Sequence, residues 1–359
     1  MTEENLVIYN YFRKTAHRLT DKACLQIKKG STWERWTYKE IEDFSSRLGA
    51  FFIRGGFKKG DCAAIILENR PEWAIIYLGI VLAGLICVPL DPQLNEREIE
   101  NLITDSGSKV IFVSHGIFLE KNIHKLNSRL NKIIILDIDI EEDNLLGFSQ
   151  IKSVSPDNIL WPQVSSQDIA SLIYTSGTTR EPKGVLLSHY NLCSNFRSIQ
   201  KVNLILPSDN FLSILPLYHT YAFMVTLLVP LFIGAKVTYC ASFRPEDLTR
   251  IIKEANVTIL VGVPQLFSLI RKAISDKVKK IPFFIKPLAL PVIKIKIKRH
   301  FGKNLRLLIS GGARLDPKIG RDLFKLGFKL IEGYGLTETS PVVTFNPPQN
   351  LKFGSVGMP

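Results

Sequence analysis

The feature that most constrains the fold is the alternation of short runs rich in Ile and Val with longer amphipathic segments along most of the chain. The run 62–67 precedes a helical pattern at 72–83, and the run 85–90 precedes another at 96–104. Parallel strands need crossover connections, which are usually helices, so this order predicts βαβ units and an α/β fold. Further runs of the same kind lie at 110–113, 169–174, 211–215, 236–239, 257–261 and 305–309.

Residues 138–168 separate two series of runs and combine acidic side chains with prolines, which is typical of a connector. Because a chain of 359 residues is long enough for two compact units, we predict two βαβ-rich subdomains at about 1–150 and 165–335. Near the N-terminus, the runs 23–27 and 33–38 flank a short polar segment with a glycine, a pattern that predicts a β-hairpin.

The chain is basic, with 46 Lys and Arg against 33 Asp and Glu and a net charge of +13 at pH 7. Many of these cations lie among apolar residues at 271–303, a mixture that suits anionic lipid headgroups. A charged face turned to water is the alternative. No recognition helix or RNA-binding signature accompanies the charge, so we expect no nucleic-acid partner. The cluster comprises Lys277, Lys279, Lys280, Lys286, Lys294, Lys296, Lys298 and Arg299.

Cysteine usage and the N-terminus both point to a cytoplasmic protein. The five cysteines are scattered without a Cys-x-x-Cys pair, so reduced thiols are the simplest interpretation. The acidic start Met1-Thr2-Glu3-Glu4 lacks the features of a signal peptide. Two uncharged runs, 74–90 and 211–235, contain prolines and predict buried strand and helix pieces rather than membrane spans. We therefore expect a cytoplasmic location, with peripheral contact at the inner face of a membrane.

The strongest chemical signal follows the run 169–174 and reads Thr175-Ser176-Gly177-Thr178-Thr179-Arg180-Glu181-Pro182-Lys183-Gly184. Its hydroxyls and backbone N–H groups can bind anionic oxygens, Gly177 allows close backbone approach, and Lys183 supplies a positive charge. It differs from the Walker A loop, in which glycine precedes the lysine and Ser or Thr follows it. The pattern predicts a phosphate loop, with a polar surface turn as the alternative.

Three further segments carry residues suited to ligand binding. Glu332-Gly333-Tyr334-Gly335-Leu336-Thr337-Glu338-Thr339 offers an aromatic face between glycines and a carboxylate, although taken alone such a turn is a loop more often than a site. Ser310-Gly311-Gly312-Ala313 follows an apolar run and leaves room either for a ligand or for tight packing. The segment 215–223 contains His219 and Tyr221 among apolar residues, where a core histidine is the simpler interpretation.

These motifs together resemble the adenylate-forming, or AMP-binding, superfamily. Glu68-Asn69-Arg70-Pro71-Glu72-Trp73 and Val88-Pro89-Leu90-Asp91-Pro92 resemble its long-chain fatty acyl-CoA synthetases. The resemblance covers most of the chain, and Arg180, in place of the usual glycine of the phosphate loop, is a departure. The resemblance implies the α/β fold of the adenylate-forming N-terminal domain. It also implies ATP and Mg²⁺ as cofactors and coenzyme A as a co-substrate.

The resemblance also implies roles for particular residues. Tyr334 would pack against adenine, Thr337 would bond the α-phosphate, and Glu338 would hold Mg²⁺. His219 would lie near the carboxylate of the acid, and with Lys183, Thr337 and Glu338 it forms the predicted catalytic set. The predicted ATP-binding residues are Thr175, Ser176, Gly177, Thr178, Thr179, Lys183, Gly312, Ala313, Gly333, Tyr334, Gly335 and Thr337, and the predicted acid-binding residues are His219, Tyr221 and Gly311.

The segment 211–235 contains no Asp or Glu, whereas an enzyme that activates amino acids needs a carboxylate for the ammonium group. We therefore predict a fatty acid as substrate. The resemblance implies attack of its carboxylate on the α-phosphate of ATP to give acyl-AMP and pyrophosphate, then thioester formation with CoA and release of AMP. The alternatives are a fatty acyl-AMP ligase that loads a carrier protein, and a non-catalytic module that binds ATP or an acyl group.

The final segment, Gly354-Ser355-Val356-Gly357-Met358-Pro359, resembles one that lies inside the family's larger domain. The resemblance places a ribose-binding Asp, a hinge and a small domain with a lysine further along. We accordingly expect residues 1–359 to be an incomplete N-terminal domain that does not complete thioester formation alone. The sequence leaves the oligomeric state open.

Overall fold

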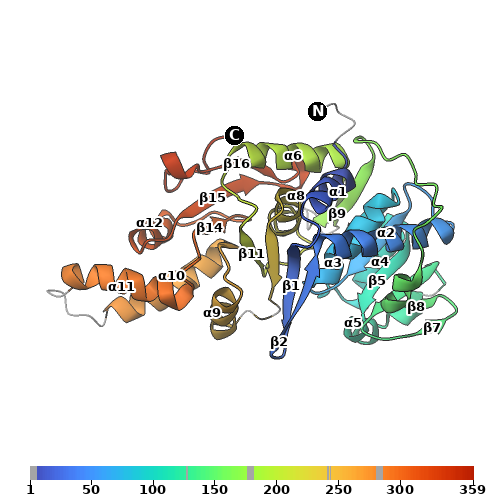
Figure 1. The fold of residues 1–359 in the computed structure, drawn as a ribbon, viewed down its shortest axis with the longest axis horizontal. Coiled ribbons are helices and arrows are strands. Elements are labelled where there is room, and N and C mark those ends of the chain that lie inside the picture. Colours follow the sequence, from blue (N-terminus) through green and yellow to red (C-terminus); the bar gives the residue numbers. More distant parts are fainter. Residues whose placement is uncertain (1–5, 127, 176–181, 241, 243, 280–285) are drawn as a thin grey trace.

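The computed structural model describes residues 6–126, 128–175, 182–240, 242, 244–279 and 286–359, with the backbone alone at 276–279, 286–290, 293, 298 and 348. Within these residues the strands form two eight-stranded sheets. Figure 1 shows the sheets side by side along the long axis of the molecule, with helices packed around them. The predicted α/β fold class is confirmed.

The first sheet has the strand order β10-β9-β4-β3-β5-β6-β8-β7. Its central strands are parallel, and the antiparallel pairs β9 with β10 and β7 with β8 form its two edges. In the order of the sheet, the strands are Lys183–Ser188, Ile169–Thr175, Ile86–Pro89, Cys62–Ile66, Ser108–Ser114, Lys132–Leu136, Leu145–Gly147 and Glu141–Glu142.

The second sheet has the strand order β16-β15-β14-β13-β11-β12-β1-β2. The strands from β15 through β1 are parallel, whereas β16 and β2 pair antiparallel at the two edges. In the order of the sheet, the strands are Val342–Phe345, Leu330–Gly335, Leu307–Ser310, Ile259–Gly262, Asn210–Ser213, Lys236–Tyr239, Ala23–Lys29 and Thr32–Thr37.

Each sheet contains strands from both predicted subdomains. The predicted hairpin is confirmed as β1 and β2. Strand β1 also pairs with β12, which lies far along the sequence, and Leu25 is the partner of Val237. Conversely, β9 and β10 join β4 through Cys87 and Ser171. The boundaries at about 1–150 and 165–335 stay a prediction about domain units. The expected connector is wrong for its first part, because the apolar Leu145 and Leu146 pair with β6 and extend the sheet.

The helices begin where the local sequence supplies caps. Thr37 and Glu40 form a reciprocal capping box at α2, and Asn95 and Glu98 form one at α4, so free N–H groups of the first turn are bonded. The helices are α1 Ile8–Arg18, α2 Tyr38–Arg54, α3 Pro71–Leu82, α4 Glu96–Ser106, α5 His115–Glu120, α6 His189–Lys201, α7 Thr220–Phe223, α8 Val229–Ile233, α9 Pro245–Glu254, α10 Pro264–Lys279, α11 Lys286–Phe301 and α12 Pro317–Lys325. The shorter helical turns are η2 Ile123–Leu126, η3 Phe148–Ser153, the π-helical η4 Met224–Leu228, η5 Thr337–Thr339 and η6 Pro348–Asn350.

An aromatic cluster joins the two sheets. Trp73 and Tyr77 of α3, which connects strands of the first sheet, contact Phe223 of α7, which follows β11 of the second. The ring centroids of Tyr77 and Phe223 lie 4.7 Å apart, edge to face, and all three side chains are buried. Burial of three aromatic side chains at this contact fixes how the sheets meet.

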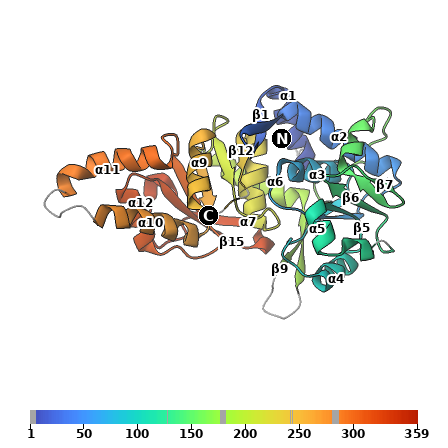
Figure 2. The ribbon, with the colours of Figure 1, turned by 90° about the horizontal axis from the view of Figure 1, so that it is seen from below.

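The two uncharged runs fold as predicted, as buried strand and helix pieces. Run 74–90 forms most of α3 together with β4, and run 211–235 forms β11 followed by α7, η4 and α8. In the part of the chain that the structure describes, no helix is both long and apolar enough to cross a membrane. Figure 2 shows α10, α11 and α12 at one end of the molecule and α4 and α5 at the other.

Candidate functional site

The carboxyl ends of the parallel strands β11, β13, β14 and β15 meet at one edge of the second sheet. Ligands of open α/β sheets bind in the crevice outside such strand ends. A cavity of about 880 Å³ lies there. Its walls are formed by residues after β11, β13, β14 and β15 and by Thr175 and Lys183 of the first sheet, so it lies where the two sheets meet.

Most of the predicted site residues line this cavity. They come from four separate parts of the sequence, which the sheet topology brings together. The predicted residues that line it are Thr175, Lys183, His219, Tyr221, Gly312, Gly333, Tyr334, Gly335, Thr337 and Glu338.

The phosphate-loop prediction falls on the connection between β9 and β10. Thr175 ends β9, Lys183 begins β10, and the two residues are paired across the antiparallel ladder. Lys183 is exposed at the cavity wall, where its ammonium group is available to an anion. The predicted residues Ser176, Gly177, Thr178 and Thr179, and the departure Arg180, lie outside the described residues.

The loop before His219 is held from the first sheet by Asn69. The Asn69 side-chain amide donates to the carbonyl of Leu215 at 2.6 Å and accepts from the backbone N–H of Leu217 at 3.1 Å. These two bonds lie on either side of Pro216 in the sequence and fix the backbone that leads to His219. Asn69 therefore positions one wall of the cavity without lining it.

His219 lies at the start of the helical run α7–η4–α8 and lines the cavity. Partial burial lowers the pKa of His219 below its ordinary value, an effect opposed by the charge of Asp91. Burial and the Asp91 carboxylate raise the pKa of the neighbouring Tyr218 to about 12. At neutral pH His219 is thus a neutral imidazole that can donate or accept a hydrogen bond.

The segment from Gly333 to Glu338 forms a second wall. The hydroxyls of Thr337 and Thr220 lie 3.1 Å apart, which links this segment to the start of α7. Tyr334 is 47% exposed and lines the cavity, so one of its ring faces can receive a planar group. A side chain at Gly335 would place its Cβ 1.7 Å from the Pro341 carbonyl, so only glycine allows this close return of the chain.

In the small-residue turn after β14, one glycine lines the cavity and the other packs against a neighbouring side chain. Gly312 lines the cavity and has φ of +77°, a conformation that favours glycine. A Cβ at Gly311 would lie 2.6 Å from the Tyr221 ring, so Gly311 makes room for that ring behind the cavity wall. Ala313 is exposed and is not among the lining residues of the described chain.

Tyr221, together with Gly333 and Val342, lines both the main cavity and a second, apolar cavity of about 60 Å³. Its hydroxyl donates to the carbonyl of Ile309 at 3.3 Å, and burial raises its pKa far above the ordinary value. No charged side chain is among the residues found to line the small cavity, which are Ile199, Val202, Leu204, Ile205, Tyr221, Val225, Leu307, Ile309, Ile331, Gly333, Val342 and Phe345.

The donor set fits a metal ion that is bound together with phosphates. Glu338 is exposed at the cavity wall, and the described residues contain no group of three or more His, Cys, Asp or Glu placed to hold a metal. Mg²⁺ commonly takes one or two carboxylates and completes its octahedral shell with phosphate oxygens and water. Glu338 could supply the carboxylate.

Several lining residues were not named individually from the sequence, although some of them lie inside the motif segments 215–223 and 332–339. Thr220 stands next to His219, and its contact with Thr337 could have been suspected only by placing the two motifs in one site. Apolar walls carry no chemical signal of their own. The other lining residues that were not named individually are Leu215, Pro216, Ala222, Val263, Leu336, Pro341 and Val342.

A crevice at the strand ends of an α/β fold, lined by a lysine, hydroxyls, a carboxylate and an aromatic face, defines the class of an α/β ligand-binding protein with a site suited to anions. The chain belongs to the AMP-binding enzyme family, whose model matches residues 12–359.

Two curated relatives show the range of the family. A 4-coumarate–CoA ligase from Vanilla planifolia is 27% identical over 370 residues, covering 99% of this chain and 62% of the relative. A long-chain-fatty-acid–CoA ligase from Yersinia pestis is 28% identical over 385 residues, covering 97% of this chain and 63% of the relative. The chain thus spans less than two thirds of the length of these relatives.

Solved structures share the fold. An anthranilate CoA ligase in complex with anthranoyl-AMP has a TM-score of 0.83 at 22% identity, covering 98% of this chain and 64% of its own. A long-chain-fatty-acid–CoA ligase from Archaeoglobus fulgidus has a TM-score of 0.83 at 19% identity, covering all of this chain and 70% of its own. Both confirm the architecture of two parallel-rich sheets.

Proposed function

We propose that the chain forms the ATP- and acid-binding part of an acid–thiol ligase that activates a fatty acid through acyl-AMP for transfer to CoA. The observation that carries the proposal is the convergence of Lys183, His219, Tyr334, Thr337 and Glu338 on one cavity at the junction of the sheets. A non-catalytic module needs no such combination of cation, carboxylate, hydroxyl and imidazole.

In this proposal each wall has one task. Tyr334 stacks on adenine, while Lys183 and Thr337 bind phosphate oxygens through charge-assisted and neutral hydrogen bonds. Bound Mg²⁺, held by Glu338, would neutralise charge on the phosphates. Neutral His219 orients the acid carboxylate toward the α-phosphate. Most of the rate enhancement then comes from positioning and from charge placed where it develops.

The acid is proposed to be apolar because the small cavity behind Tyr221 carries no charged lining residue among those described. The ammonium group of an amino acid would find no partner there and would be costly to bury. A volume of about 60 Å³ holds only a few water molecules. A long acyl chain therefore requires Tyr221 to turn aside, and we propose that it does so.

A compact aromatic acid is the second candidate. The unmoved Tyr221 limits the depth of the acid pocket, and 4-coumarate–CoA ligases are among the relatives that match nearly the whole chain. The same adenylation chemistry would apply to either acid.

Non-hydrolysable acyl-sulfamoyl adenosines distinguish these acids because they join the nucleotide and the acyl group in one molecule. Calorimetric titration of the 359-residue chain should show the tightest binding for the palmitoyl compound, weaker binding for the coumaroyl compound, and the weakest for the alanyl compound. A coumaroyl preference would establish the second candidate. Preference for the alanyl compound would overturn the apolar acid.

CoA is proposed as the acyl acceptor in the whole protein, with a carrier protein as the alternative. Mass spectrometry of the products formed with each acceptor separates the two. A cytoplasmic location with contact at the inner face of a membrane is also part of the proposal, and its chemical basis is an apolar substrate together with the basic residues of α11.

A further inference from the structure

We infer that the outer surface of α10 and α11 is a docking site for an anionic lipid bilayer. This inference specifies the membrane contact included in the proposed function and rests on it, but it does not depend on the ligase reaction, because the surface lies apart from the cavity. Figures 1 and 2 both show α11 at the end of the molecule, away from the junction of the two sheets.

Basic and apolar side chains share the outward face of α11. Val292, Ile295, Lys296 and Arg299 stand at spacings of three and four residues, which places them on one side of a helix. All four are exposed, and Val292 and Ile295 are 53% and 52% exposed. Lys294 is exposed as well and adds a further cation to this helix, although its position in the helix lies off this face.

The opposite side of α11 is packed against the protein, so the outward face is fixed. Ile297 and Phe301 pack against the hydrophobic core, and the ring of Phe301 lies 5.9 Å from that of Phe328, edge to face. The helix cannot bury Val292 and Ile295 by rotating without losing these contacts.

Few acids oppose the positive charge. The sequence 286–303 contains six Lys and Arg and no Asp or Glu. On α10, Leu269 is 59% exposed and Lys272 is exposed one turn further along. Arg271, which also belongs to the predicted basic segment, is instead paired with Asp322 at 2.6 Å.

A groove of about 670 Å³ adjoins this surface, between α9 and α10 and beside the end of α11, and its lining combines apolar residues with the charged Glu246, Arg250, Lys253 and Glu254. Its floor includes Leu212 and Leu260 of the sheet, and Leu248 and Leu266 belong to its walls. Apolar surface of this kind suits acyl chains at the headgroup boundary, whereas binding to a nucleic-acid backbone needs only the cations. The combination favours a bilayer as the partner.

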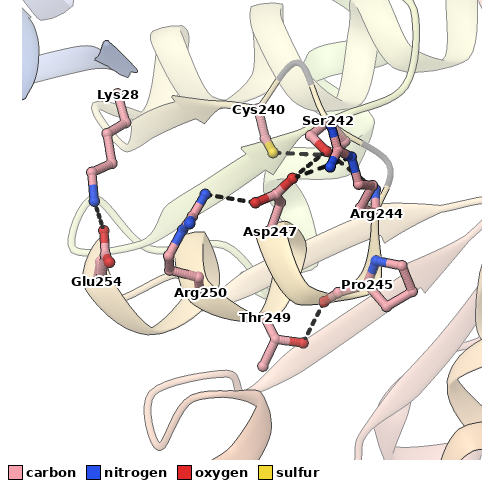
Figure 3. A network of polar contacts seen from close by, with 9 residues as sticks. All are labelled: Lys28, Cys240, Ser242, Arg244, Pro245, Asp247, Thr249, Arg250 and Glu254. Carbon is pink, nitrogen blue, oxygen red and sulfur yellow. Dashed lines mark hydrogen bonds and ion pairs between the residues drawn. The ribbon is translucent and has the colours of Figure 1, made fainter. Parts of the chain in front are cut away.

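The wall formed by α9 is held in place by polar contacts (Figure 3). The Asp247 carboxylate accepts from the Ser242 hydroxyl at 2.7 Å and from Arg250 at 2.6 Å. At the other end of the helix, Glu254 forms an ion pair with Lys28 of β1. The groove is therefore a fixed feature beside α11.

The test uses sedimentation with vesicles of phosphatidylcholine alone and of phosphatidylcholine with 30% phosphatidylglycerol. We expect binding to the anionic vesicles, much weaker binding to the neutral ones, and loss at high salt. The triple variant Lys294→Gln, Lys296→Gln, Arg299→Gln should bind about 100-fold more weakly. Val292→Gln with Ile295→Gln should weaken binding about tenfold.

The matched control is Lys14→Gln, Lys39→Gln, Lys201→Gln, which removes the same charge from exposed positions on α1, α2 and α6. It should bind within about threefold of the parent chain, and circular dichroism should show all variants folded. Equal loss in both triple variants, or equal binding to neutral vesicles, would overturn the docking site. So would duplex DNA that displaces the vesicles while the apolar variant binds them normally, because the surface would then be a general polyanion site.

Discussion

At the scale of single residues, polar side chains outside the cavity determine where its walls stand. Asn69 belongs to the segment after β3 in the first sheet, yet its amide bonds the backbone at Leu215 and Leu217 in the second. The sequence marked Asn69 only through a family resemblance. Its role depends on a contact between residues almost 150 positions apart, which no local pattern reveals.

Replacing Asn69 with Ala should leave two backbone groups of this loop unpaired. We expect the free energy of unfolding to fall by about 2 kcal/mol, and an acyl-sulfamoyl adenosine to lose more affinity than ATP does. Urea unfolding and calorimetry measure the two effects. Asn101→Ala, at an exposed position on α4, is the control. If both variants behave alike, Asn69 does not position the loop.

His189 makes stability depend on pH. It is buried, its Nδ1 accepts from the backbone N–H of Ile8 at 3.3 Å, and burial lowers its pKa from 6.5 to about 4. The unfolded chain therefore binds a proton that the folded chain rejects between these values. Stability from this group is complete above pH 6.5 and falls as the pH drops toward 4, by about 1.4 kcal/mol per pH unit and about 3 kcal/mol in all.

The variant His189→Gln keeps an acceptor for the Ile8 N–H group but has no proton to gain. Urea unfolding of both chains at pH 7, 6, 5 and 4 should show that the parent loses about 3 kcal/mol more than the variant. If the unfolding free energies of the two chains fall in parallel with pH, His189 takes up its proton as readily in the folded state as in the unfolded state.

At the scale of elements, the turn from β15 into η5 brings Tyr334, Thr337 and Glu338 to the cavity. The chain returns so closely that a Cβ at Gly335 would lie 1.7 Å from the Pro341 carbonyl, whereas a Cβ at Gly333 has its nearest neighbour at 3.6 Å. Two neighbouring glycines of one strand therefore differ sharply in what they tolerate.

Gly335→Ala should force the backbone apart and destabilise the chain by about 3 kcal/mol, while Gly333→Ala should change stability by less than about 1 kcal/mol. Thermal unfolding of the two variants compares them directly. Equal melting temperatures would show that the turn can adapt and that glycine is not required for its geometry.

Element type and position could be read from local patterns, but element partners could not. Strand β3 at Cys62–Ile66 and helix α3 at Pro71–Leu82 agree closely with the predicted 62–67 and 72–83, since hydrophobic periodicity reports local burial. The exchange of β1–β2 and β9–β10 between sheets depends on pairings such as Leu25 with Val237. Such pairings are set by tertiary packing.

At the scale of the whole molecule, the cavity exists because the two sheets meet. Lys183 belongs to the first sheet, whereas His219, Thr337 and Glu338 belong to segments of the second. The aromatic cluster of Trp73, Tyr77 and Phe223 joins the two sheets. Motif chemistry predicted these polar residues, because cations, hydroxyls and carboxylates are recognisable in sequence. The apolar walls were not predicted, since an apolar residue has the same appearance in a pocket and in a core.

Calorimetric titration of the 359-residue chain with ATP shows whether this junction binds Mg²⁺ and ATP. We expect tighter binding with Mg²⁺ than without it, an affinity lowered about 10- to 100-fold in Lys183→Ala, and loss of the Mg²⁺ effect in Glu338→Ala. The exposed Lys201→Ala serves as the control. ATP affinities that are the same in the parent and all three variants, with Mg²⁺ and without it, would show that ATP and Mg²⁺ do not bind through these residues.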